Sequence, residues 1–297
     1  MKKQAVVIAL DDSCVSGCLI TLHTLLKYSN NFNTELIVFE WGQLSEPNKD
    51  LIKQIYPNTS FRKVDESYYI NNQEHDHLQR KWNYNCNYRF DIFGLEEYDK
   101  IVYTDVDILF KLDIQELLNY DVDFGACQMP NYTKYNQTLV SKVFNAGLLV
   151  VGKKFLNQET KKQLIEYSNT TPPKDEHTLS NKWFGNQPIL NNYFHSSVSW
   201  LPIKYNTLTE DLVLGSTNLP INLHYVGTNK PWLTTNLEDS FCENVISSIY
   251  DKTEHTVLRK MILKKARQIV IDEISSLLKE HPKIPFFDFL RTETQLS

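Results

Sequence analysis

Two aspartates one residue apart, Asp105 and Asp107, follow a short apolar run at residues 101–103. The run is typical of a buried strand, and side chains two positions apart in an extended chain point to the same side. We therefore expect both carboxylates to converge just past the C-terminal end of that strand, where ligands bind in α/β sheets. Two carboxylates with open positions suit a hard divalent cation that also takes oxygen ligands from a diphosphate.

The elements around this pair predict a parallel sheet. Apolar runs at residues 5–10, 36–39 and 61–64 indicate strands, and helical periodicity fills the segments between them. Alternating strands and helices are typical of a nucleotide-binding sheet. No Gly-x-Gly-x-x-Gly sequence and no P-loop follows the first strand, so acidic residues and a metal would have to hold a nucleotide here. Further along we expect strands at residues 124–128, 144–151 and 223–226, and helices at residues 114–118 and 153–167 and around Pro188.

The C-terminal part of the chain predicts one long helix, residues 254–279, with two open interpretations. An apolar stripe follows one side of the helix, and five basic and no acidic residues lie between positions 258 and 267. Such a helix can pack its stripe on its own domain. It can also lie in a membrane interface, where basic residues are attracted to anionic lipid. The stripe consists of Leu258, Ile262, Ala266, Ile269 and Leu277.

Composition limits the class of protein. The 297 residues carry 31 basic and 36 acidic side chains, a net charge of −5, so a basic footprint for nucleic acid is absent. Five cysteines without a Cys-x-x-Cys pair favour a reduced compartment. The first apolar run is too short and too soon followed by Asp11 and Asp12 to be an export signal. We therefore expect a cytoplasmic protein, peripheral at the inner face of the cytoplasmic membrane if residues 254–279 bind lipid.

Four motifs occur in a fixed order: the Asp105 stretch, Phe-Asn-Ala-Gly at residues 144–147, Asn-Gln at residues 186–187, and a segment that runs from His224 to Trp232. This order resembles glycosyltransferase family 8, which includes the glycogenins and the bacterial retaining α-glucosyl- and α-galactosyltransferases that build lipooligosaccharides. The resemblance implies a GT-A fold in residues 1–240, an α/β class with a Rossmann-like nucleotide-binding half and a mixed central sheet. Residues 241–297 would form a helical, basic C-terminal extension.

The resemblance also implies a set of site residues. Asp105, Asp107 and His224 match ligands of Mn²⁺, or of Mg²⁺ in its place, and the donor would be a UDP-sugar. Gln187, Asn186 and Asp105 are the implied catalytic residues. The implied donor-binding residues are Ala9, Asp11, Ser13, Arg89, Asp105, Val106, Asn145, Ala146, Gln187, Gly227 and Lys230.

Two positions depart from the family pattern. Cys14 stands where the family often has an aromatic residue that stacks on uracil, and Asn186 stands where it usually has aspartate. Asparagine cannot act as a base or carry negative charge, so the implied mechanism is front-face retention, with Gln187 orienting rather than attacking.

The implied function is Mn²⁺-dependent transfer of a hexose, glucose or galactose, from UDP to a glycan, glycolipid or glycoprotein acceptor, as in bacterial cell-surface glycan synthesis. Two alternatives stay open. One is a nucleotidyltransferase that makes the sugar nucleotide, although such enzymes usually carry a Gly-rich N-terminal loop. The other is a non-catalytic nucleotide- or carbohydrate-binding protein on a degenerate scaffold.

Overall fold

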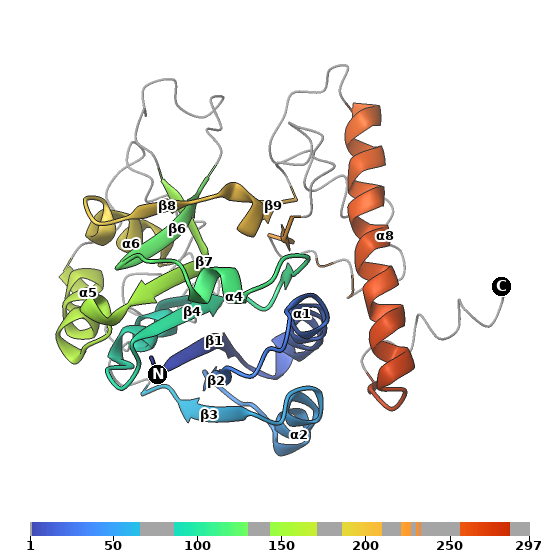
Figure 1. Ribbon diagram of the computed structural model, residues 1–297, viewed down its shortest axis with the longest axis horizontal. Helices are drawn as coiled ribbons and strands as arrows, with labels where there is room; N and C mark the ends of the chain where they lie inside the picture. The colour runs from blue at the N-terminus through green and yellow to red at the C-terminus, as the bar shows by residue number, and fades with distance from the viewer. Residues whose placement is uncertain are drawn as a thin grey trace.

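The computed structural model describes residues 2–65, 86–129, 143–170, 186–209, 221–226, 230, 232 and 256–285 (Figure 1). In the helix at 256–280 the side chains are described from Lys265 onward. The strands are β1 (Gln4–Leu10), β2 (Glu35–Glu40), β3 (Thr59–Lys63), β4 (Lys100–Thr104), β5 (Ile108–Leu109), β6 (Phe124–Gln128), β7 (Phe144–Gly152), β8 (Ser199–Leu201), β9 (Thr207–Leu208) and β10 (Leu223–His224). The α-helices are α1 (Val15–Tyr28), α2 (Glu46–Ile55), α4 (Gln115–Leu118), α5 (Gln158–Thr170), α6 (Gln187–Phe194) and α8 (Thr256–Glu280). Short 3-10 helices are η1 (Asp12–Cys14), η3 (Cys86–Gly94), η4 (Lys153–Phe155) and η5 (Ile203–Tyr205).

A seven-stranded sheet in the order β3-β2-β1-β4-β7-β6-β8 forms the centre of the molecule. Strands β3, β2, β1 and β4 are parallel, whereas β7 is antiparallel to both β4 and β6. The first half is therefore the expected nucleotide-binding type of sheet, and the antiparallel neighbour makes the whole sheet mixed. A second sheet of three short strands, β5-β10-β9, lies beyond the end of β4.

Strand β1 shows why its sequence is a continuous apolar run. Val6 and Ile8 belong to the core on one face of the sheet, and Ala5 and Val7 belong to the core on the other. All four side chains are fully buried. Strands buried on both faces lose the alternation of polar and apolar residues that a half-exposed strand would have.

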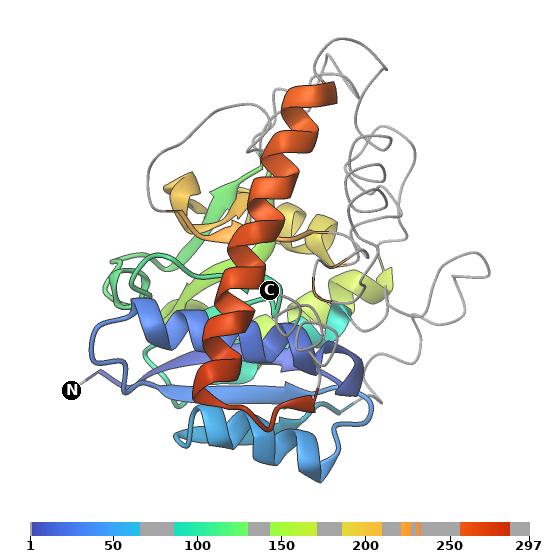
Figure 2. The ribbon, with the colours of Figure 1, turned by 90° about the vertical axis from the view of Figure 1, so that its right-hand side faces the viewer.

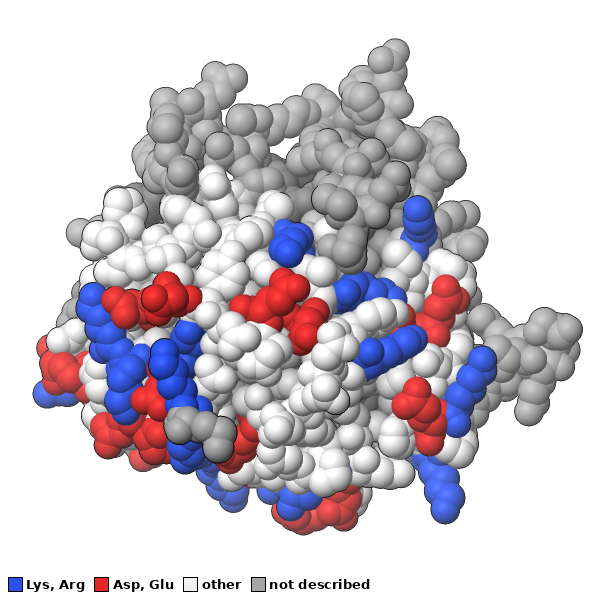
Figure 3. Space-filling view, in the orientation of Figure 1, with Lys and Arg blue, Asp and Glu red and all other residues white. Residues whose placement is uncertain are grey.

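Helices cover both faces of the large sheet (Figure 1). Residues of α1, α2 and α8 contribute to the first core, while η3, α5 and α6 contribute to the second. In the second core the ring of Phe194 stacks on that of Phe124, with centroids 3.8 Å apart. Acidic and basic side chains are mixed over the face seen in Figure 3.

Helix α8 lies against α1 along one side of the molecule (Figures 1 and 2). Ala266, Val270, Ile274 and Leu277 are buried in the same core as α1. The expected long helix is therefore confirmed, and in the part from Lys265 onward its apolar stripe packs on its own domain. None of the helices in the described part of the chain combines the length and apolar character needed to span a bilayer.

Two expected boundaries were wrong. The helix expected at residues 153–167 begins only at Gln158, because residues 153–155 form a 3-10 turn and the Asn157 side chain accepts from the backbone N–H of Thr160, 2.8 Å away. The strand expected at residues 223–226 ends at His224. The expected division between residues 240 and 241 falls outside the described residues.

Candidate active site

Asp105, Asp107 and His224 come together at the end of β4. One ligand atom from each lies within 4.8 Å of the other two. Asp105 directly follows β4, whereas Asp107 lies in a turn that leads into β5. Strand β10 pairs with β5 and places His224 opposite Ile108. The expected convergence is confirmed, but the expected reason was wrong, because a turn rather than extended alternation brings the carboxylates together.

Asp107 has one oxygen in use and one without a hydrogen bond. Its Oδ2 accepts from the ammonium group of Lys230. Its Oδ1 is buried and lies 3.1 Å from Nε2 of His224, yet it makes no hydrogen bond in the described structure. Burial alone would raise the pKa of Asp107, but Lys230 and His224 outweigh burial and lower it, so the carboxylate is ionised at neutral pH. A buried, ionised oxygen that lacks a hydrogen bond fits a cation ligand.

Asp105 presents its second oxygen to the same point. Its Oδ1 accepts from Nη2 of Arg89 and from the hydroxyl of Tyr103, each at 2.6 Å. The Arg89 guanidinium also lies over the Tyr103 ring, 4.7 Å from the centroid. The other carboxylate oxygen of Asp105, Oδ2, lies 4.0 Å from Nε2 of His224. Two carboxylate oxygens and one imidazole nitrogen suit Mn²⁺ or Mg²⁺, and the residues present therefore fit such an ion.

Gly147 in β7 makes room for His224. A Cβ at this position would overlap the His224 ring and would lie 2.9 Å from its Nδ1. The carbonyl of Gly147 also accepts from the backbone N–H of Asp105 at 2.7 Å. The space that a side chain at this position would fill is therefore taken by the His224 ring.

Four more of the implied catalytic and donor-binding residues, from Arg89 to Gln187, connect α6, β7 and η3. Asn186 is 1% exposed, and its Oδ1 accepts from Nη1 of Arg89 at 3.2 Å. Gln187 accepts through Oε1 from the backbone N–H of Ala146 at 2.9 Å. Asn145 accepts through Oδ1 from the backbone N–H two residues later. Arg89 thus joins the Asn186 side chain to the Asp105 carboxylate.

Several of the implied donor-binding residues lie at the neighbouring corner, where β1 ends and α1 begins. Asp11 caps η1 through a bond from the Ser13 N–H at 2.9 Å, and Ala9 lies near the end of β1. The Val106 carbonyl packs so close to α1 that a Cβ on Gly17 would lie 2.5 Å from it. Gly227, another implied donor-binding residue, lies outside the described residues.

Cys14, at the start of α1, lies close enough to the cluster to be affected by its charges. Burial, followed by the negative charges of Asp11 and Asp107, raises the pKa of the Cys14 thiol to about 11. The thiol is therefore neutral at physiological pH and adds no charge to this corner.

Sequence reasoning missed two members of the site, Tyr103 and Asn206. Tyr103 lies two residues before Asp105, so alternation along β4 could have indicated it. Asn206 bonds to the side chains of Asn145 and His224, which are 61 and 18 residues away in sequence, and no local pattern indicates it.

Solved structures identify the fold. The galactosyltransferase LgtC in complex with donor and acceptor sugar analogs superimposes with a TM-score of 0.60 at 18% identity, over 86% of this chain and 99% of that one. The bifunctional glycosyltransferase WbbM gives a TM-score of 0.59 at 23% identity, over 82% of this chain and 50% of that one. The sheet order and these likenesses define a GT-A fold, as the sequence predicted.

The family follows from the sequence match. The model of glycosyl transferase family 8 matches residues 5–236, most of the chain, and the protein belongs to this family.

Curated relatives match over shorter stretches. The lipopolysaccharide 1,3-galactosyltransferase of Salmonella typhimurium is 26% identical over 177 residues, 52% of this chain and 50% of that protein. Glycosyltransferase GlyE of Streptococcus pneumoniae is 30% identical over 149 residues, 45% of this chain and 34% of that protein. The chain thus spans half or less of the length of these curated relatives.

Proposed function

We propose that this protein transfers a hexose, glucose or galactose, from a UDP-sugar to a glycan, glycolipid or glycoprotein acceptor, with retention at the anomeric carbon and with Mn²⁺, or Mg²⁺ in its place. The observation that carries the proposal is the buried Oδ1 of Asp107, which has no hydrogen bond and converges with Asp105 and His224. Membership of the family supports sugar transfer over synthesis of the sugar nucleotide.

The charges of the site match those of the donor. Two carboxylates, Asp105 and Asp107, face two cations, Arg89 and Lys230, so the cluster is close to neutral. A divalent cation would add two positive charges to the cluster. These would match the two negative charges of a UDP-sugar diphosphate. When bound by Asp105, Asp107 and His224, the cation would supply Lewis-acid stabilisation of charge on the departing UDP.

Lys230 and Arg89 act on opposite ends of the donor in this proposal. Lys230, released from Asp107, would hold a diphosphate oxygen as a compact point charge. Arg89 would contact the sugar while its bonds to Asp105 and Asn186 keep the guanidinium in place. Arg89 would therefore be positioned before the substrate arrives.

Retention would come from front-face attack. The bond between the anomeric carbon and the β-phosphate oxygen breaks, and the bond to the acceptor oxygen forms on the same face. The acceptor proton passes to that phosphate oxygen, and UDP leaves. Gln187 would orient and polarise the sugar, because an amide fixed by the Ala146 N–H is a poor nucleophile. Asn186 is uncharged and would hold Arg89 rather than act as a base.

Donor screening tests the proposal. The protein is incubated with UDP-glucose, UDP-galactose and their N-acetyl analogues with Mn²⁺, and release of UDP is measured with and without EDTA. We expect one hexose donor to be turned over and EDTA to stop the reaction. Full turnover in EDTA would contradict the metal site, and donor binding without turnover on any acceptor would favour the non-catalytic alternative.

The proposal for location is a cytoplasmic enzyme that binds peripherally to the inner membrane face through residues 254–279. The apolar stripe from Lys265 onward is used in packing on α1, so binding would rest on the basic residues at 259–267, of which Lys265 is exposed. Each basic residue near an anionic lipid surface would contribute roughly 1 kcal/mol of electrostatic attraction to the binding free energy. Sedimentation with anionic and with neutral vesicles at low and high salt tests it, and no binding to anionic vesicles at low salt would contradict it.

A further inference from the structure

We infer that Asn206 is a positioning residue that fixes the ring orientation and the tautomer of His224, so that its Nε2 is prepared to ligate the cation. The inference rests on the proposed metal site. Asn206 lies directly before β9 and is 2% exposed, and β9 pairs in parallel with β10, which carries His224. The Asn206 side chain therefore reaches the ring from the side opposite the carboxylates.

A chain of hydrogen bonds determines which nitrogen carries the proton. It begins at the backbone N–H of Gly147, which can only donate, and which lies 2.8 Å from Oδ1 of Asn145. That oxygen is therefore an acceptor, and the Asn206 group 2.9 Å from it must be the donor Nδ2. The other end of the Asn206 amide, Oδ1, then faces Nδ1 of His224 at 2.9 Å. Since Oδ1 can only accept, Nδ1 must carry the proton.

The opposite nitrogen is left for the cation. With the proton on Nδ1, Nε2 is the nitrogen on the side where Asp105 and Asp107 lie, and its lone pair would bind a cation there. The 3.1 Å approach to Asp107 Oδ1 lacks hydrogen-bond geometry, as expected of two ligands directed at a third point.

The surroundings keep the ring in this position. The His224 ring already fills the space that a Cβ on Gly147 would occupy, so the ring cannot move closer to β7. The backbone N–H of Thr209 donates to the His224 carbonyl at 3.0 Å and holds β10 against the end of β9. Without a proton on Nδ1, its lone pair would face Oδ1 of Asn206 at 2.9 Å with no room for anything between them, whereas a cation would lie between Nε2 and the carboxylates. An outer partner of this kind typically changes metal affinity by about 10–100-fold when it is removed.

The experiment measures the tautomer and the metal affinity separately. Long-range proton–nitrogen spectra of histidine-labelled, metal-free protein at one fixed pH of about 8.5 report which ring nitrogen is protonated, and His224→Gln identifies the signal. Titration of MnCl₂ in the presence of UDP, followed by the electron paramagnetic resonance of free Mn²⁺, gives the affinity. The variants are Asn206→Leu, which removes the acceptor, and Asn206→Asp, which keeps an acceptor towards Nδ1. Ile52→Ala, which alters a buried residue of α2, is the control for general destabilisation.

We expect the wild type to have the proton on Nδ1 of His224. Asn206→Leu should lose this single tautomer and bind Mn²⁺ about 10–100-fold more weakly, whereas Asn206→Asp, which loses the donor to Asn145, should keep the proton on Nδ1 and bind Mn²⁺ more tightly than Asn206→Leu does. Ile52→Ala should change neither measurement. A wild type in which Nδ1 carries no proton, or an unchanged tautomer in Asn206→Leu, would overturn the inference even if the variant folds poorly. Absence of Mn²⁺ uptake by the wild type would contradict the proposed metal site, while the tautomer still decides the role of Asn206.

Discussion

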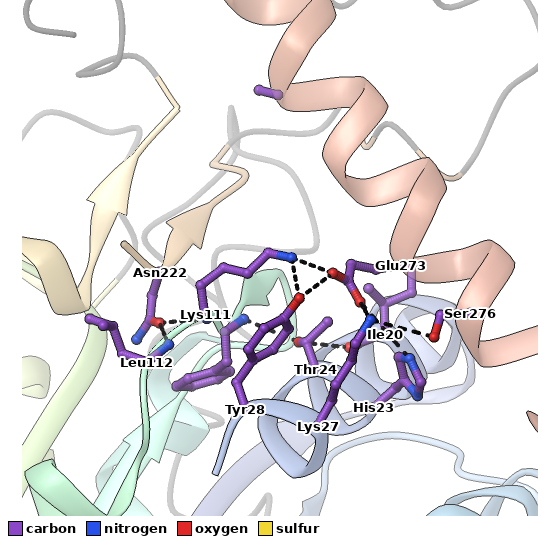
Figure 4. Close-up of polar contacts among 12 residues, drawn as sticks. Ile20, His23, Thr24, Lys27, Tyr28, Lys111, Leu112, Asn222, Glu273 and Ser276 are labelled. Atoms are coloured by element: carbon purple, nitrogen blue, oxygen red, sulfur yellow. Dashed lines mark hydrogen bonds and ion pairs between the residues drawn. The ribbon is translucent and has the colours of Figure 1, made fainter. Parts of the chain in front are cut away.

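Two regions of the molecule place an acid between two basic side chains in a buried setting, and they differ in how many hydrogen bonds the acid accepts. In the candidate active site, Asp107 lies between His224 and Lys230. At the junction of α8 with α1, Glu273 lies between Lys27 and Lys111 (Figure 4).

Glu273 uses both of its oxygens. Its Oε1 accepts from the hydroxyl of Tyr28 at 2.8 Å and from Lys111, and its Oε2 accepts from Lys27 at 2.8 Å (Figure 4). In Asp107 only one oxygen accepts a hydrogen bond. The complete cluster fastens α8 to α1 and to the segment after β5, whereas the incomplete one has the oxygen that a cation would take.

The pKa does not distinguish the two regions. Burial raises the pKa of both acids, and neighbouring cations and hydrogen bonds lower each below its ordinary value. A perturbed pKa can therefore belong to a structural ion pair as well as to a functional site. Hydrogen-bond satisfaction separates the two cases, and the following predictions test that criterion.

The largest expected effect is on activity. Asp107→Asn should reduce the transfer rate by about 10³-fold or more, because it removes a charged cation ligand, and Asp105→Asn should act similarly. The thermal midpoint should also fall, because the substitution removes the ion pair with Lys230. Turnover and thermal unfolding of the same preparation check this. A normal rate in either variant would reject the metal assignment.

The next effect concerns the sugar end of the site. Gln187→Ala should lower the transfer rate by about 10²-fold, the scale of one positioning or electrostatic group, while UDP affinity is retained. The reason is that Gln187 is held by the Ala146 N–H, away from the Asp107–Lys230 end of the cluster. Calorimetric titration with UDP and steady-state rates separate the two quantities. An unchanged kcat would exclude Gln187 from the reaction.

The candidate site was largely predictable because its members follow strand ends or belong to ordered motifs. Asp105 and Asp107 follow an apolar run, and His224 and Lys230 are six residues apart in a motif. The turn between the aspartates was not predictable, because β5 has two residues and shows no periodicity.

The α8 junction was less predictable. An apolar stripe on a basic helix suits packing and membrane binding equally, so the sequence left both open. Glu273 is 246 residues from Lys27 and 162 from Lys111, and only the fold brings these side chains together. The positions of Ala266 and Leu277 in the stripe were nevertheless correct, since both are buried.

The third prediction concerns stability. Glu273→Gln should lower the free energy of unfolding by about 3 kcal/mol, the low end for one partner of a buried ion pair, because both lysines reach solvent. Glu280→Gln is the matched control: it lies on the same helix with a side chain 59% exposed, and should cost less than about 1 kcal/mol. Urea denaturation measures both. Equal losses in the two variants would show that completing the hydrogen bonds of Glu273 does not stabilise the junction.

The smallest effect is the pH dependence of the same junction. His23 in α1 is 4% exposed, and its Nε2 makes no hydrogen bond in the part of the chain that the structure describes. Burial lowers its pKa, although Glu280 and Glu273 oppose this, and Lys27 and His281 also face the ring. A histidine whose pKa is lowered by folding binds fewer protons in the folded state. Its contribution is therefore fully favourable above the ordinary pKa of about 6.5 and is lost as the pH falls through the lower, folded value.

Glu273 also has a lowered pKa, but for an acid the stabilisation is lost only as the pH falls below the ordinary carboxyl value of about 4.3. The two groups therefore act in separate windows. In urea denaturation at pH 7.5, 6.5 and 5.5, the wild type should lose stability at each step and His23→Gln should lose less, because glutamine takes up no proton. Parallel curves for the two proteins would show that His23 is not the group that titrates between α1 and α8. A smaller change of unfolding free energy with pH in His23→Gln would show that His23 is the group that takes up the proton. The buried nitrogen without a hydrogen bond would then mark a place where the molecule binds a cation, here a proton, as the free oxygen of Asp107 does for a metal ion.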